Sequence, residues 1–231
     1  MRQRLVLSLF GIAFLVIGGP GTARSQTVAD SGQWTALFSQ GDFDHGGQWK
    51  WWFDGHLRLL DDAGGFNQSI VRPGIGWNLN DNLAVWAGYG WIHTAPLAGD
   101  NFDEHRTWQQ LTWSHGDEAW TFAFRSRLEQ RFLETGADTG WRFRQLVRMQ
   151  HHLPELPRLS FVAWDEIFFH LNDTDWGAVS GFDQNRLFVG FGWKHQPNSR
   201  LRTEIGYLNQ LIDIPSGADR VNHILSINFY Y

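Results

Sequence analysis

The residues best suited to chemistry in this 231-residue chain are arginines and glutamates spaced two apart. Between residues 119 and 132, Arg125, Arg127, Glu129 and Arg131 occupy alternate positions, and the opposite parity of the whole stretch, from Trp120 to Phe132, is mostly aromatic or aliphatic. A period of two is that of a β-strand, in which successive side chains point to opposite faces. Because a guanidinium group binds carboxylates and phosphates through paired N–H donors, the charged face predicts ion pairing or anion binding.

The same alternation recurs in ten stretches from Gln48 to the C-terminus, and residues 33–40 show a weaker example. Bases outnumber acids on the charged parity of these stretches. The candidate cluster comprises Glu104, Arg106, Arg125, Arg127, Glu129, Arg131, Arg142, Arg144, Arg148, Glu166 and Arg186. Further charged residues of the same parity are Lys50, Asp54, Arg58, Arg72, Lys194, Arg202 and Glu204. Counting back from the connection at residues 134–140 predicts that Glu129 lies opposite Arg144.

Such strands fit a soluble sandwich, with the apolar face as core, or a transmembrane barrel, with that face toward lipid. The chain holds 14 Trp and 18 Phe at a negative mean hydropathy, and it shows no sustained helical period. Short connections (78–82, 115–118, 153–158 and 195–200) alternate with longer ones (94–103, 134–140, 172–181 and 213–220). The sequence therefore predicts an all-β protein, an antiparallel transmembrane β-barrel of 10–12 strands with short periplasmic turns and longer outer loops.

An even strand number is expected of bacterial single-chain barrels, so ten or twelve strands fit and eleven do not. Either residues 33–40 lie outside the wall or one strand escapes the pattern.

The N-terminus predicts export. Arg2 and Arg4 precede an apolar run, and small residues around Ser25 form a cleavage site, so residues 1–25 are expected to be a signal peptide. Residues 26–47 are expected to be a leader with a weak strand, and residues 48–231 the barrel. Losing three arginines with the signal would take the net charge from −5 to about −8, which argues against nucleic acid as a partner. The absence of cysteine excludes disulfides and thiol chemistry.

Several short motifs follow one another in an order that resembles one known family. They are Arg72-Pro73-Gly74, Glu104-His105-Arg106, Arg125-x-Arg127-x-Glu129-x-Arg131-Phe132, Arg142-x-Arg144, Asp165-Glu166-x-Phe168, Phe182 to Arg186 and Gly206 to Gln210. Together they resemble the domain of unknown function 2490 family of Gram-negative exported proteins. The resemblance covers nearly all of the mature chain and implies an outer-membrane β-barrel. It implies no activity and therefore no catalytic residues.

The charged interior has two interpretations. Ion pairs can fill a narrow barrel and tie its wall together, or unpaired arginines can attract anions. The sequence thus predicts a monomeric, porin-like outer-membrane barrel, either a narrow anion-leaning channel or a structural wall element. The alternative is a lumenal or loop-borne binding or enzymatic site for an anionic ligand such as a lipid headgroup. The expected partners are outer-membrane lipid and a small anionic solute. The histidines lack ligand spacing, and no metal or cofactor is predicted.

Overall fold

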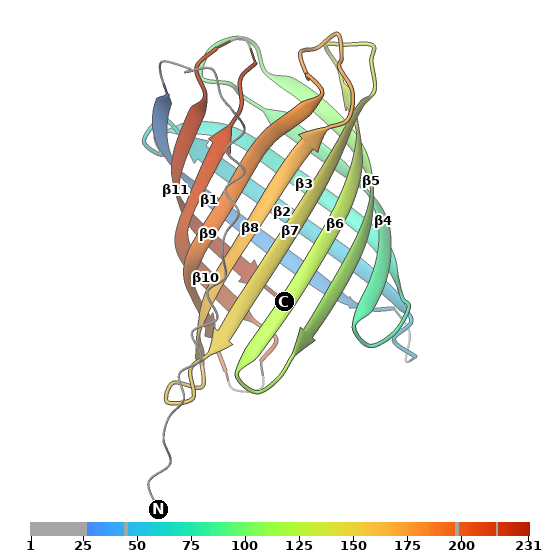
Figure 1. Ribbon diagram of the computed structural model, residues 1–231, viewed down its shortest axis with the longest axis vertical. Helices are drawn as coiled ribbons and strands as arrows, with labels where there is room; N and C mark the ends of the chain where they lie inside the picture. The colour runs from blue at the N-terminus through green and yellow to red at the C-terminus, as the bar shows by residue number, and fades with distance from the viewer. Residues whose placement is uncertain (1–26, 44–45, 197–198, 216) are drawn as a thin grey trace, which may run out of the picture.

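The computed structural model describes residues 27–43, 46–196, 199–215 and 217–231, which form one closed β-barrel (Figure 1). The predicted signal peptide lies outside the described residues. The strands are β1 (Val28–Asp42), β2 (Trp49–Leu60), β3 (Gly65–Asn78), β4 (Leu83–Thr94), β5 (Phe102–Gly116), β6 (Trp120–Leu133), β7 (Gly140–His152), β8 (Leu159–His170), β9 (Gly181–Lys194), β10 (Arg202–Ile212) and β11 (Arg220–Tyr230). The described residues contain no helix long and apolar enough to cross a bilayer.

The barrel closes through a parallel pair of strands. Each strand from β1 to β11 pairs antiparallel with the next along the chain, whereas β1 and β11 run parallel, with Trp34 beside Ser226. The expected even strand number is therefore wrong, because one parallel pair closes a wall of eleven strands. The weak stretch at residues 33–40 belongs to that wall, within a strand of 15 residues. Its alternation is hard to recognise because Trp34 and Ala36 face inward and polar residues face outward.

Connections of different character gather at opposite ends of the barrel. The end drawn at the top of Figure 1, here the upper end, carries the connections after β2, β4, β6, β8 and β10, of which the longest covers residues 171–180. The lower end carries the connections after β1, β3, β5, β7 and β9 and the C-terminus. Most of the longer connections lie at the upper end, as predicted, but the upper β2–β3 connection (61–64) is short and the lower β9–β10 connection (195–201) is as long as two of the upper ones. Val28 lies at the upper end, where its N–H donates to the carbonyl of Asp219 at 2.9 Å.

The wall has its polar side chains inside and many of its apolar side chains outside. Phe191 and Ile205 on the outer face are 54% and 50% exposed, whereas Arg127 and Glu129 on the inner face are 1% and 0% exposed. Aromatic rings pair on the outer face near the lower end, for example Phe161 with Phe191 at 6.1 Å between centroids. These exposures confirm the inward and outward faces that the alternation in the sequence predicted.

Two glycines make room for a large ring in the lumen. Gly74 on β3 and Gly88 on β4 are direct partners, and the indole of Trp108 on β5 lies over both. A Cβ at Gly88 would stand 2.3 Å from Trp108 Cζ2 and 2.4 Å from the carbonyl oxygen of Pro73, closer than atoms can approach. The fold therefore needs glycine here so that Trp108 can lie flat against the wall.

Candidate functional site: an arginine-rich lumen

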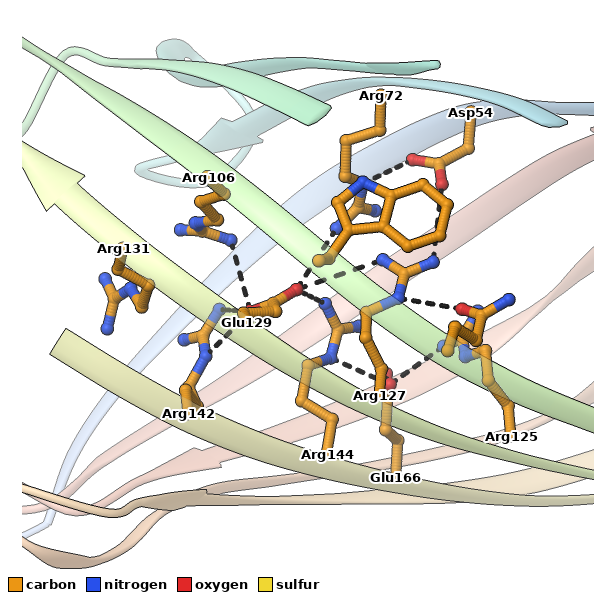
Figure 2. A network of polar contacts seen from close by, with 12 residues as sticks. Asp54, Arg72, Arg106, Arg125, Arg127, Glu129, Arg131, Arg142, Arg144 and Glu166 are labelled. Carbon is orange, nitrogen blue, oxygen red and sulfur yellow. Dashed lines mark hydrogen bonds and ion pairs between the residues drawn. The ribbon is translucent and has the colours of Figure 1, made fainter. Parts of the chain in front are cut away.

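All the candidate residues lie on the inner wall. They come from β5 to β9, and most are less than one-tenth exposed. Figure 2 shows the centre of this group, where five guanidinium groups converge on the carboxylate of Glu129. Those guanidinium groups belong to Arg72, Arg106, Arg127, Arg142 and Arg144. A carboxylate with no exposure is stable as a charge only among such donors.

The closest partner of Glu129 differs from the predicted one. Glu129 stands directly across from Arg142, and Arg144 stands across from Arg127, so the predicted register is wrong by two residues. Arg142 donates from Nε and Nη2 to one oxygen of Glu129, at 3.0 and 2.6 Å, and Arg144 donates from Nη1 to the other at 2.7 Å. The spacing of charges predicted the cluster, but the length of the β6–β7 connection did not fix the register.

Glu104 is held by two arginines in the same manner. Arg106 donates from Nε and Nη2 to the two oxygens of Glu104 at 2.6 and 2.7 Å, and Arg131 donates from the same two nitrogens at 2.6 and 3.1 Å. Each guanidinium thus presents a two-pronged fork to the carboxylate, which is the strongest geometry for this pair. Glu104 therefore neutralises part of the charge of two strands, β5 and β6.

Other ion pairs join strands that are not neighbours. Arg125 on β6 donates to Glu166 on β8 at 2.8 Å, and Arg148 on β7 donates to Glu204 on β10 at 2.5 Å. Arg142 also reaches Asp183 on β9 at 3.1 Å. Pairs of this kind pass over one or two intervening strands and tie separated parts of the wall together.

Asp183 was absent from the candidates for a local reason. A register shift in the β8–β9 pair lies between Phe168 and Phe169, next to the position of Asp183, so parity counting misplaces this residue. In the structure its carboxylate lies within 3.5 Å of His170 Nε2 as well as beside Arg142. The signal in the sequence was its place in the Phe182 to Arg186 motif, where Asp183 directly precedes the inward-facing Gln184.

Asp54 on β2 is a further buried carboxylate that pairs with an arginine of the lumen. Trp52 Nε1 and Arg72 Nε donate to its oxygens at 2.8 and 2.6 Å, and His56 Nε2 lies at 3.0 Å. Arg127 Nη2 approaches the same carboxylate only to 3.9 Å. Arg127 is instead seated on an aromatic face, with its guanidinium carbon 4.5 Å from the centre of the Trp108 ring.

We call this group the acid-balanced cluster. Its members are Asp54, Arg72, Glu104, Arg106, Arg125, Arg127, Glu129, Arg131, Arg142, Arg144, Glu166 and Asp183.

A second group of arginines has amide partners instead. Arg58 on β2 donates from Nη1 to Gln68 Oε1 at 2.8 Å, and Arg186 on β9 donates from Nε to Gln184 Oε1 at 3.0 Å. Both guanidinium groups lie against Trp34, at 4.0 and 5.0 Å from its ring centre. Amide oxygens accept hydrogen bonds but carry no net charge. The amide-lined cluster, as we name it, consists of Trp34, Arg58, Gln68, Gln184, Arg186, Gln210 and Asn222.

Two cavities enter the lumen and meet at a ring of five residues. The lower cavity has a volume of about 710 Å³ and the upper cavity about 400 Å³. Both are lined by Trp34, Arg58, Arg72, Arg144 and Arg186. We call these five residues the septum. The same four guanidinium groups therefore line both cavities.

A clasp of two connections lies at the mouth of the upper cavity. The N–H groups of Ala137 and Asp138 donate to the carboxylate of Asp175 at 2.8 and 3.2 Å, and these bonds hold its pKa below the usual value. Asp138 answers by accepting from the N–H of Asp175 at 2.8 Å and from the indole of Trp176 at 2.9 Å. Trp176 lines the upper cavity, and the guanidinium carbon of Arg131 lies 4.9 Å from its ring centre.

No group of three His, Asp or Glu side chains in the described ranges is arranged to hold a metal ion.

Comparison with known proteins gives a family but no activity. Residues 31–222 match the model of a family described as "Protein of unknown function (DUF2490)". A similar protein, an uncharacterized protein of Methylorubrum extorquens, is 33% identical over 234 residues, a match that covers 99% of this chain and 97% of that relative. A match over most of the barrel, with a relative of nearly equal length, establishes membership: the chain belongs to the DUF2490 family of proteins of unknown function.

Proposed function

We propose that the protein spans the bacterial outer membrane as a monomeric barrel and conducts small anions through a narrow, arginine-lined lumen. The septum carries this proposal, because its four guanidinium groups line both the lower and the upper cavity. Rings of Arg or Lys favour the passage of anions over cations. In this function Arg58 and Arg186, which have no carboxylate partner among the described residues, act as the selectivity filter, and the ion-paired Arg72 and Arg144 complete the constriction.

The apolar outer face supports insertion in a membrane. Exposed side chains of strands on several sides of the barrel, such as Val85, Phe124 and Leu225, are 38–49% exposed, and aromatic pairs lie near the lower end. An apolar band with aromatic girdles is the signature of an outer-membrane wall. With the longer connections outside the cell, Val28 would lie on the outer side and the C-terminus on the periplasmic side.

The outer face also carries polar side chains at mid-height. Asp165 on β8 points outward, and the amide of Asn185 on β9 donates to both of its oxygens at 3.0 Å. A carboxylate that faces acyl chains is costly. The two hydrogen bonds offset part of that cost, so this position is compatible with a lipid-facing wall.

Conductance in planar bilayers tests the proposed function. The refolded mature protein should open small channels whose reversal potential in a KCl gradient shows a preference for chloride over potassium. Arg186→Glu should reduce or reverse that preference because it places a negative charge in the septum. Arg158→Gln is the matched control, since Arg158 lies over Trp193 and lines neither cavity. Cation preference in the unmodified protein would rule out an anion path.

A structural wall element is the second candidate, and the ion pairs between strands that are not neighbours favour it. Arg148–Glu204 and Arg142–Asp183 tie separated strands together, and the fully buried Arg127 and Glu129 fill the centre of the lumen. A protein with only this role would show no channel openings under any gradient. It would also unfold more readily when any of these pairs is removed, with no transport phenotype.

A further inference from the structure

Arg58 and Arg186 are buried cations without an acid beside them. Their side chains are 7% and 9% exposed, and no carboxylate oxygen of the described residues lies within 4.0 Å of either guanidinium group. Glu166 stands across from Arg186 in the strand register, but its oxygen binds Arg125 and Arg144. Neither guanidinium group therefore has a direct ion-pair partner among the described residues, although Glu166 and Asp183 line the same cavities as Arg186. Arg58 and Arg186 also lie near each other, because both guanidinium groups pack on the ring of Trp34. Two buried positive charges without a paired acid favour a bound counter-charge.

The same cluster contains hydrogen-bond donors that are buried and unused. Arg58 Nε and Trp34 Nε1 are both shielded from solvent and have no acceptor in the described part of the chain. Buried donors are almost always paired, and leaving one unpaired costs about 1–3 kcal/mol. The missing partner is therefore an acceptor, and the surrounding charge requires that it be negative.

The spacing of the two guanidinium groups suits a small ligand. Their central carbons lie 4.0 and 5.0 Å from the centre of the Trp34 ring, so they are at most 9.0 Å apart, the sum of those distances. Arg58 is also the direct cross-strand partner of Trp34. An oxyanion with several oxygens can accept from a planar fork on each side at roughly 2.8 Å, which a spherical halide cannot do as well.

We propose that Trp34, Arg58 and Arg186 form a binding site for a small oxyanion of the phosphate or carboxylate class, retained at the septum between the two cavities. The ligand receives the Arg58 Nε and Trp34 Nε1 hydrogen bonds and neutralises both arginines. This inference rests on the proposed function in one respect, that solutes can enter the lumen from at least one end. It does not require that they pass through.

Equilibrium binding of inorganic phosphate to the full chain in detergent tests the site. Arg58→Gln and Arg186→Gln should each raise the dissociation constant ~10-fold or more, because each removes charge-assisted bonds to the ligand. Trp34→Phe, which keeps the ring and removes the N–H, should raise it by a smaller factor. Arg58→Lys keeps the charge without the two-pronged donor, so its dissociation constant should lie between those of the unmodified protein and Arg58→Gln. A folding defect in one variant therefore leaves the test intact.

Arg148→Gln is the control with the same change of charge. Arg148 lies in the lower cavity and binds Glu204, which keeps Arg202 as a second partner after the substitution. Its dissociation constant for phosphate should stay within a factor of about two, because it makes no contact in the amide-lined cluster. An equal loss in Arg148→Gln would show that only the overall lumen charge attracts phosphate, and the site would be withdrawn.

The remaining arms separate the ligand's source and the two proposals. Acetate in place of phosphate tests the carboxylate class, and a short-chain phosphatidic acid tests a lipid headgroup. If either compound competes with phosphate, and the competition depends on Arg58, that compound's class binds the same site. Phosphate that binds a non-conducting barrel, with the expected variant pattern, would retain the site and remove the channel. Absence of binding at 10 mM phosphate, acetate and lipid (on the order of the weakest affinity useful here) would overturn the site whatever the conductance.

Discussion

The acid-balanced cluster and the amide-lined cluster use the same side chain in opposite ways. In the first, carboxylates between β2 and β9 hold every arginine except Arg127 within hydrogen-bond distance, as Glu104 holds Arg106 and Arg131. In the second, Arg58 and Arg186 have neutral amides and one indole around them. A neutralised arginine strengthens the wall, whereas an arginine without a counter-charge is available to a ligand. The difference locates binding on the side of the lumen that the acids do not reach.

Removing the central acid should have the largest effect. Glu129→Leu leaves five arginines around a buried site without a counter-charge, and breaking a buried pair by removing one partner costs about 3–5 kcal/mol. Urea unfolding of the refolded barrel, followed by tryptophan fluorescence, measures the loss. Glu204→Leu is the comparison, and it should cost less because Arg148 and Arg202 line the larger, lower cavity, where water can solvate them. Equal losses would mean that the centre of the acid-balanced cluster has no special role.

A change beneath Trp108 should have the next largest effect. Gly88→Ala forces a Cβ against Trp108 and the backbone of Pro73, and overpacking of this kind costs about 1–3 kcal/mol. Displacing the indole also removes the aromatic face on which Arg127 lies. Ala87→Gly, at the outward position next to it, controls for a general effect of substitution in β4. Urea unfolding should show a clear loss for Gly88→Ala alone, and a near-unchanged midpoint would show that Trp108 can shift freely.

The amide-lined cluster should respond in the opposite direction. Without added oxyanion, Arg58→Gln should leave the free energy of unfolding unchanged or raise it by about 1 kcal/mol, because it removes an uncompensated buried charge. Phosphate at 100 times its dissociation constant should stabilise the unmodified barrel by about 2.7 kcal/mol and leave Arg58→Gln where it was. A destabilised Arg58→Gln in phosphate-free buffer would place Arg58 with the structural arginines and end the contrast between the clusters.

The clasp at the upper mouth should show the smallest effect, one that depends on pH. The pKa of Asp175 is held below the ordinary Asp value of about 3.9 by the N–H groups of Ala137 and Asp138. The clasp is therefore fully formed above that ordinary value and is lost as the pH falls through the lower, folded-state value. The hydrogen-exchange protection factor of the Ala137 amide, relative to the intrinsic rate at each pH, should fall only at acid pH in the unmodified protein. Asp175→Asn should show faster exchange at neutral pH as well, and exchange that is slow in both would mean that other contacts hold the mouth.

Parity along the strands predicted the lumen side chains well and their partners poorly. Arg125 to Arg131 were placed on the inner face because each strand buries alternate residues, a rule that acts locally. The Glu129–Arg142 partnership, by contrast, depends on the register of β6 against β7. Asp183 entered the acid-balanced cluster through a register shift in the β8–β9 pair that parity cannot detect. Local periodicity therefore identifies which residues share the lumen, and inter-strand register decides which of them touch.

The sequence by itself determined which side chains share a face of each strand, because successive residues of a strand point to opposite faces. The alternating connection lengths and the abundance of aromatic residues then favoured a barrel over a sandwich. The tertiary structure decided the parallel closure of β1 on β11, which brings Trp34 between Arg58 and Arg186. Those three residues come from β1, β2 and β9, and no local pattern relates strands so far apart in the chain. Which arginines find an acid is likewise a matter of distances across the lumen, and only the closed wall sets those distances.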